Sequence, residues 1–283
     1  MILKHYLIRT AKDPMNFLML ILFPFVLTSV FITTSIMGVD FGLRSYNGFC
    51  LIATGMLAFN VLFFQYFGGM LVTDYLYFEF RTDMRWRLMA TPKPLRSFIL
   101  AAIGASIVIG AVNGAIVLVA ARFIFNTYFN IPITIIALMG MSVFVTLFGV
   151  LCFQLFPKKG TTTAVIMVFA FAQMFGLNFG MIPNPELGEL GIASFLPLGA
   201  ASMAMNYASG MIATINSPEM YVELHGATDA VVARLEGMET AWERGFTLWG
   251  QDMSMAYTHL GILGGLIAVA LIAVVIIGKV RKI

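Results

Sequence analysis

Seven long stretches of this sequence contain no Asp, Glu, Lys or Arg, and this pattern limits the possible folds more than any other feature. A helix needs about 20 apolar residues to cross a bilayer core roughly 30 Å thick, and backbone groups in lipid must bond within their own segment. Only 11% of the residues are charged, against roughly 25% in soluble domains. The chain is therefore predicted to be an all-α integral membrane protein. The charge-free stretches are residues 15–39, 45–73, 97–121, 123–157, 160–185, 190–218 and 253–278.

Length and apolar composition select six of these stretches as transmembrane helices. The seventh, residues 190–218, is weaker because it contains Pro197, two asparagines and three glycines. We expect one transmembrane domain that covers residues 1–283. Its predicted spans are residues 15–37, 48–73, 98–121, 132–155, 161–182 and 254–277.

The distribution of Lys and Arg predicts the orientation of these spans. Basic residues favour the cytoplasmic side of a membrane. With six spans and both termini in the cytoplasm, only four of the 17 basic residues lie outside, namely Arg44, Arg122, Arg234 and Arg244. A seventh span would move the basic C-terminus outside, so we interpret residues 190–218 as an interfacial or re-entrant segment.

Several kinds of chemistry are missing from the sequence. It has no G-x-x-x-x-G-K-[ST] phosphate loop and no H-E-x-x-H metal motif, so no catalytic, cofactor-binding or metal-binding residue is predicted. The predicted spans also contain no Asp, Glu, Lys or Arg, whereas ion-coupled transporters commonly place ionisable groups at mid-membrane. Energy for any transport is therefore expected to come from another protein. His259, in the first turn of the last span, is interpreted as an interfacial residue bonded to water.

The longest predicted cytoplasmic loop is residues 74–96, DYLYFEFRTDMRWRLMATPKPLR. Residues 85–89 could form one or two helical turns. Pro92 would end them at Thr91, because the residue before a proline avoids the α conformation. This short basic helix could set the topology by touching anionic lipid, or it could be a docking element for a cytoplasmic partner.

The run RWRLMATPKPLRSFILA, residues 85–101, resembles the segment after the second span in ABC-2 type permeases, which reads R-L-L-A-T-P before the third span. The N-terminal residues 9–14 and the Phe-Leu-Pro at 195–197 are also similar to elements of that family. Arg81 and Asp83 depart from its pattern. The matching positions in the loop are Glu79, Arg87, Leu88, Met89, Ala90, Thr91 and Pro92.

The resemblance implies a permease subunit of an ABC exporter, in the plasma membrane of a bacterium or archaeon. In that family two permeases, identical or different, pair in the lipid bilayer, and each engages a separate ATPase that carries ATP and Mg. This chain would then be no enzyme and would need no cofactor or nucleic acid. The family's coupling helix would comprise Glu79, Arg85, Trp86, Arg87, Leu88, Thr91 and Pro92.

The N-terminal segment of the family lies along the membrane, and residues 1–13 fit such an amphipathic interfacial helix. Leu3, Leu7 and Ala11 fall on one stripe, with the basic residues largely off it. The third span carries small residues at four-residue spacing, which indicates close packing against another helix. These are Ala102, Ser106, Gly110 and Gly114.

In this family the second and fifth spans line the central cavity. Aromatic and methionine faces suit a hydrophobic or amphipathic cargo, such as a drug, an antimicrobial peptide or a lipid-like molecule. The same residues could instead face lipid or only pack helices together. Amide side chains are unfavourable in lipid. Gln65, Gln173, Asn60 and Asn178 should therefore face a neighbouring helix or a cavity. The pathway residues are Phe59, Asn60, Phe63, Tyr66, Phe171, Met174, Phe175 and Asn178.

Residues 183–252 are predicted to lie outside the cell and carry nine acidic residues against two basic ones. A near-helical stripe of apolar residues favours a helical cap over the outer mouth, although a solvated acidic loop is equally compatible. The acids could attract a cationic cargo. Alternatively, the chain could be a non-transporting immunity or sensor protein that binds its ligand at this cap. The cap residues are Glu236, Glu239, Trp242 and Glu243.

Overall fold

Every element in the described part of the chain is helical, as predicted. The computed structural model describes residues 2–12, 14, 18, 22–23, 25–27, 29–30, 46–84, 86, 90–91, 94–125, 129–176, 192–209 and 253–281. Most of the predicted first span and of the external cap lie outside these residues. The elements are α1 (Ile2–Ala11), α4 (Tyr46–Phe64), α5 (Tyr66–Phe80), α7 (Leu95–Phe125), α8 (Ile131–Leu155), α9 (Lys159–Gly176), the 3₁₀ helix η4 (Ile192–Phe195), α10 (Pro197–Ala208) and α14 (Met253–Arg281).

Four of the described helices are long and apolar enough to cross a membrane. They correspond to the predicted second, third, fourth and sixth spans. Helix α9 matches the start of the fifth, but its described residues end at Gly176. The six-span topology and its sidedness stay predictions. The four segments are Thr54–Phe80, Arg96–Ile124, Ile131–Leu155 and Met253–Val280.

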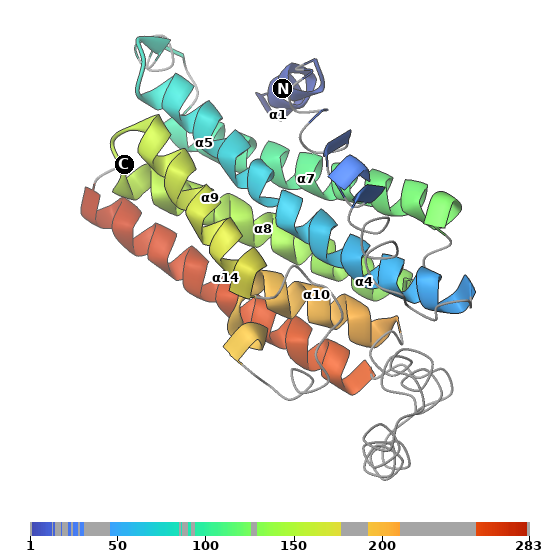
Figure 1. Ribbon diagram of the computed structural model, residues 1–283. Helices are drawn as coiled ribbons and strands as arrows, with labels where there is room; N and C mark the ends of the chain where they lie inside the picture. Colours follow the sequence, from blue (N-terminus) through green and yellow to red (C-terminus); the bar gives the residue numbers. More distant parts are fainter. Residues whose placement is uncertain are drawn as a thin grey trace.

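Helix α8 lies in the middle of the bundle, where it packs against α5, α7, α10 and α14 (Figure 1). Its first residue follows Asn130, whose side-chain oxygen accepts the N–H of Ile133 at 3.4 Å. Pro132 occupies the first turn, a position that lacks a helical hydrogen bond in any case. The helix ends at Leu155, just before Pro157. These local signals explain why the observed bounds match the predicted span 132–155 so closely.

Helix α10 is the described core of the segment predicted to be interfacial or re-entrant. All of its 12 residues are buried, and it packs against α4, α8 and α14. At 1.5 Å per residue it is about 18 Å long, which is too short to cross the membrane. The burial corrects the interfacial alternative, because a helix on the membrane surface would expose one face. It agrees with the re-entrant alternative.

Helix α1 is seen nearly end-on in Figure 1, whereas the long helices run across the view. It therefore lies across the bundle, where it packs against α7. The residues it buries are Tyr6 and Thr10, while Leu3 and Ile8 are exposed. The predicted Leu3–Leu7–Ala11 stripe is assigned to the membrane interface, and the exposure of Leu3 is compatible with that prediction. The side that faces the protein is instead the one that carries Tyr6 and Thr10.

Three chain segments gather at one end of the bundle: the α5–α7 connection, the α8–α9 turn and the C-terminal end of α14 (Figure 1). They carry many of the basic residues that were assigned to the cytoplasm. We call this the basic end.

Candidate functional site

The helix that carries the predicted second-span pathway residues has one irregular turn at Gln65, between α4 and α5, which we call the break. Gln65 itself keeps helical backbone angles, with φ at −59° and ψ at −23°, so α4 and α5 continue one another as a single span, Thr54–Phe80. The N–H of Gln65 donates to the carbonyl of Leu62 at 3.2 Å, and the N–H of Gly68 donates to the carbonyl of Gln65 at 2.8 Å. These i to i+3 bonds tighten the helix locally. The backbone N–H and carbonyl of Gln65 are therefore bonded within the helix, and it is the buried side-chain amide of Gln65 that needs partners from other helices.

Side chains of α7 and α8 supply those partners. Ser142 Oγ donates to Gln65 Oε1 at 2.9 Å, and Ser106 Oγ donates to the carbonyl of Gly68 at 2.6 Å. Thr146 Oγ1 lies 3.2 Å from Ser106 Oγ. All of these side chains are buried. The break is therefore held by a buried seam of hydrogen bonds between three helices, which we call the polar seam.

Two glycines of α7 make room for the Gln65 amide. A Cβ atom on Gly110 would lie 2.6 Å from Gln65 Oε1, and one on Gly114 would lie 2.7 Å from Gln65 Nε2. Both distances are shorter than real Cβ contacts. The predicted row of small residues in the third span is therefore confirmed as a packing surface. Its two glycines leave the space that the Gln65 side chain occupies.

Helices α5 and α8 meet backbone to backbone beside the seam. A Cβ on Gly149 would lie 2.4 Å from the carbonyl oxygen of Gly69, and a Cβ on Gly69 would lie 2.6 Å from the carbonyl oxygen of Val145. Backbone atoms cannot move aside as a flexible side chain can. Only glycine therefore fits at these two positions.

Gln173 of α9 links the broken helix to the buried helix α10. Its Nε2 donates to Tyr66 Oη at 2.6 Å, and its Oε1 accepts the N–H of Leu198 at 3.1 Å. Leu198 lies in the first turn of α10, where backbone N–H groups have no partner within the helix. The expectation that Gln65 and Gln173 bond to other helices is confirmed. Asn60 instead donates to the carbonyl of Met56 in its own helix.

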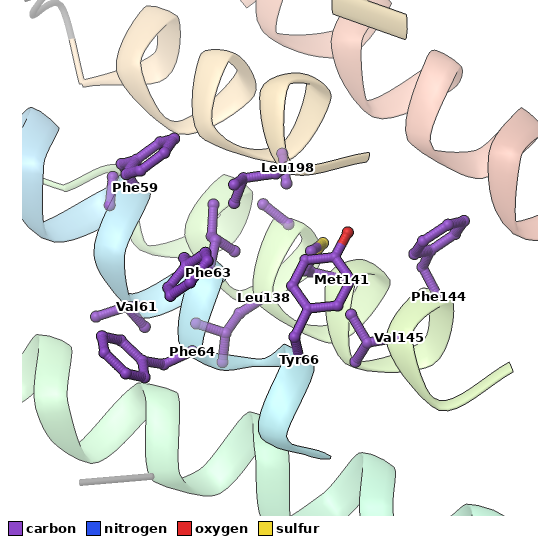
Figure 2. Close-up of a cluster of buried hydrophobic side chains, with 14 of the residues drawn as sticks. Phe59, Val61, Phe63, Phe64, Tyr66, Leu138, Met141, Phe144, Val145 and Leu198 are labelled. Atoms are coloured by element: carbon purple, nitrogen blue, oxygen red, sulfur yellow. The ribbon is translucent and has the colours of Figure 1, made fainter. Parts of the chain in front are cut away.

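The predicted pathway faces of the second and fifth spans do meet. The rings of Phe63 and Phe171 lie 5.5 Å apart. Phe59, Phe63 and Tyr66 are buried, and Figure 2 shows them near Leu198 of α10. On α9, Met174 is buried, whereas Phe171 and Phe175 remain exposed. Asn178 lies outside the described residues. That these residues line a transport pathway stays a prediction.

At the basic end, α1 is fastened to α5. The Tyr6 hydroxyl donates to the Glu79 carboxylate, and the Tyr6 ring lies 4.9 Å from that of Tyr75. The guanidinium of Arg9 lies 4.6 Å from the centre of the Phe78 ring, which is a cation–π contact. Burial raises the pKa of Tyr6 above its usual value, as does the bond to Glu79. Tyr6 therefore keeps its proton and acts as the donor.

Replacing Tyr6 by phenylalanine should loosen α1 from α5. A lost hydrogen bond that leaves a buried carboxylate unpaired costs about 1–3 kcal/mol. We expect trypsin to cut after the exposed Arg9 and Lys12 several times faster than in the parent protein. Lys4→Gln, on the exposed side of the same helix, should leave cleavage after Arg9 and Lys12 unchanged. Equal cleavage of Tyr6→Phe and the parent would contradict this role.

Three of the residues assigned to the coupling helix are described, namely Glu79, Trp86 and Thr91, and they lie at the basic end. Trp86 is 72% exposed, and Thr91 is exposed as well. Glu79 is buried against Tyr6, so in this structure it anchors the helix that leads into the loop. The side chains of Arg85, Arg87, Leu88 and Pro92 lie outside the described residues, as do all four residues of the predicted external cap.

The interpretation of His259 as a water-bonded interfacial residue is wrong. Its exposed fraction is 0%, because η4 and α10 pack over this part of α14. Its Nδ1 lies 2.8 Å from the carbonyl of Met255, and its Nε2 lies 3.2 Å from Ser194 Oγ. A carbonyl only accepts, so Nδ1 carries the proton and Nε2 accepts from Ser194. The ring also stacks on Tyr207.

Long apolar helices, one of them broken and held by a buried polar seam, define a helical integral membrane protein. A family profile described as ABC-2 family transporter protein matches residues 28–276. The chain belongs to this family, which confirms the resemblance found in the sequence. It is therefore a membrane transport component, of a kind that is generally not itself catalytic. No curated protein and no solved structure matches the chain.

Proposed function

We propose that this chain is the permease subunit of an ATP-driven exporter and moves a hydrophobic or amphipathic compound out of the cell. A separate ATPase, with its own ATP and Mg, supplies the energy by binding the α5–α7 connection at the basic end, which faces the cytoplasm. A second permease, identical or different, completes the assembly in the plasma membrane.

The observation that carries this proposal is the continuous path along α5. The helix starts at the break at Gln65 and leads directly into the loop that displays Trp86. Exposed tryptophans are common anchors of protein interfaces. Helix α5 packs against α7, α8 and α9. A displacement of the loop by the bound ATPase would therefore be transmitted along α5 to the polar seam.

The side chains near the break favour an apolar cargo. Phe63 and Phe171 pair across α4 and α9, and Phe175 of α9 is exposed. Such aromatic faces bind hydrophobic and amphipathic molecules without requiring one fixed shape. The reconstituted complex should therefore hydrolyse ATP faster when hydrophobic drugs or lipid-like molecules are added.

Replacing Arg85, Trp86 and Leu88 together by alanine tests the docking role. Loss of an aromatic anchor typically weakens an interface by about tenfold or more. We expect transport by the reconstituted complex to fall by at least about that factor, while the variant permease still folds. The measurement is transported cargo per ATP hydrolysed, together with thermal stability.

Phe123→Ala is the matched control, because this aromatic is 84% exposed at the other end of α7. It should leave transport unchanged. Normal transport by the triple variant would refute the proposed docking site, and a purified chain that acts without any ATP-binding subunit would refute the exporter itself.

A further inference from the structure

The turn between α8 and α9 is fastened to the helix that leads into the docking loop. Tyr77 of α5 donates its hydroxyl proton to the carbonyl of Phe156 at 2.6 Å, and its Oη lies 2.8 Å from Thr162 Oγ1. One turn earlier on α5, the carboxylate of Asp74 pairs with Lys159 Nζ at 3.0 Å. The turn and the end of α5 are therefore joined by two hydrogen bonds and an ion pair.

This turn lies close to the docking loop. Tyr77 precedes Arg81 by four residues, or about 6 Å of helix. The guanidinium of Arg81 lies 5.4 Å from the ring centre of Phe153, in the last turns of α8. The start of the loop is thus held against the same helix whose end forms the turn.

The turn presents an exposed surface whose net positive charge comes from Lys158, because Lys159 is paired with Asp74. Pro157, Lys158, Lys159 and Gly160 are all exposed. The N-terminus of α9 adds a partial positive charge at the same place. No described atom beyond the chain neighbours lies within 4 Å of a Cβ built on Gly160. The structure therefore leaves room here for a partner.

A partner that binds the docking loop needs more surface than the loop offers. A standard protein interface uses about 20–30 residues on each side, whereas the connection between α5 and α7 has only 14 residues, 81–94. The turn is the adjoining surface that is firmly attached to the same helix.

We infer that the α8–α9 turn, residues 155–160, is a second contact surface for the ATP-hydrolysing subunit and faces an acidic patch on it. This rests on the proposed function, since it takes the occupant to be the subunit that binds Trp86. A displacement of the turn by the ATPase would be transmitted to α5 through Tyr77 and Asp74. It would add to the displacement transmitted through the docking loop.

Gly160→Trp tests the contact, because the new side chain has room within this chain but would intrude on a docked partner. Gly176→Trp is the matched control: it lies at the other end of α9 and also has open space among the described atoms. Tagged chains are purified from the cell that makes them, and the companion subunit that 8-azido-ATP labels is quantified. We expect about tenfold less companion with Gly160→Trp and no change with Gly176→Trp.

Charge reversal provides an independent measurement. Lys158→Glu should weaken capture of the labelled subunit and reduce the salt dependence of binding, because it removes an attraction to acidic residues. Lys12→Glu, on the exposed side of α1, is the control. Thermal stability of each variant shows that it is folded.

The outcomes separate the two proposals. If the wild-type chain captures an azido-ATP-labelled subunit and both Gly160→Trp and Lys158→Glu capture it equally well, the second contact is refuted while the proposed function stands. If the wild-type chain captures no such subunit, the proposed function fails and this inference fails with it.

Discussion

Gly149→Leu is expected to leave no folded protein, and even Gly149→Ala should be strongly destabilising. The added Cβ would lie 2.4 Å from the carbonyl oxygen of Gly69, so α5 and α8 would have to separate. Overpacking a well-packed core costs about 1–3 kcal/mol, and a contact with rigid backbone falls at the upper end. At about 2–4 °C per kcal/mol, the apparent melting temperature should fall by about 6–12 °C.

Gly265→Ala in α14 is the matched control. It is also a glycine within a long apolar helix, and no described atom lies within 4 Å of the added Cβ. Alanine favours helix over glycine by about 1 kcal/mol, so this variant should be as stable as the parent or more stable. Thermal unfolding in detergent, followed by size-exclusion chromatography, measures both. Equal stability of Gly149→Ala and Gly265→Ala would show that the helices do not meet as closely as the structure indicates.

The approximate positions of the described helices could be predicted because the signals for them are local. A stretch without charge shows that a helix can lie in lipid, and Asn130, Pro132 and Pro157 mark the ends of α8 within a few residues. The family could also be identified from sequence, since the docking loop carries its pattern in one continuous run.

The break at Gln65 could not be predicted, because it is not a property of its own helix. No proline stands there, and the position is specified by Ser142, 77 residues away, and by Gly110 and Gly114 on a third helix. The sequence revealed the small residues and the amides separately. Their combination into one polar seam exists only once the helices are packed.

The same limit applies to His259 and to the predicted pathway. A histidine near the end of a span resembles an interfacial residue until η4 and α10 are placed over it. Phe59 and Phe63 share a helical face by spacing alone, but their burial depends on α10, which spacing cannot locate. In both cases the burial depends on α10, a helix distant in the sequence, and the pattern of a single span contains no information about it.

Gln173→Met is expected to release α10 from the bundle. Methionine has a similar length but no hydrogen-bonding amide, so Tyr66 Oη and the N–H of Leu198 would both lose a buried partner. Each loss costs about 1–3 kcal/mol, or about 2–6 kcal/mol together. Because the N-terminus of α10 carries one of the two bonds, much of this cost should appear as local opening of that helix.

Labelling of a buried cysteine measures that opening. Ser202→Cys places a thiol on α10, where Ser202 is buried, in a chain whose two natural cysteines are replaced. A maleimide should label it at least about tenfold faster when Gln173→Met is also present, since opening is favoured by more than about 1.4 kcal/mol. Tyr66→Phe removes only one of the two bonds, and the Gln173 amide keeps a contact to the carbonyl of Phe169 at 3.3 Å. Its effect should be smaller.

Gln65→Met separates local release from general weakening. This variant also removes a buried amide, but Gln65 bonds to Ser142 of α8 and not to α10. It should lower the melting temperature while leaving the labelling rate of the Ser202→Cys thiol close to that of the parent. If Gln65→Met and Gln173→Met accelerate labelling equally, Gln173 contributes only to general stability. If neither does, the N-terminus of α10 is held by its apolar contacts alone, and the hydrogen bond to Leu198 is not what keeps this helix in the bundle.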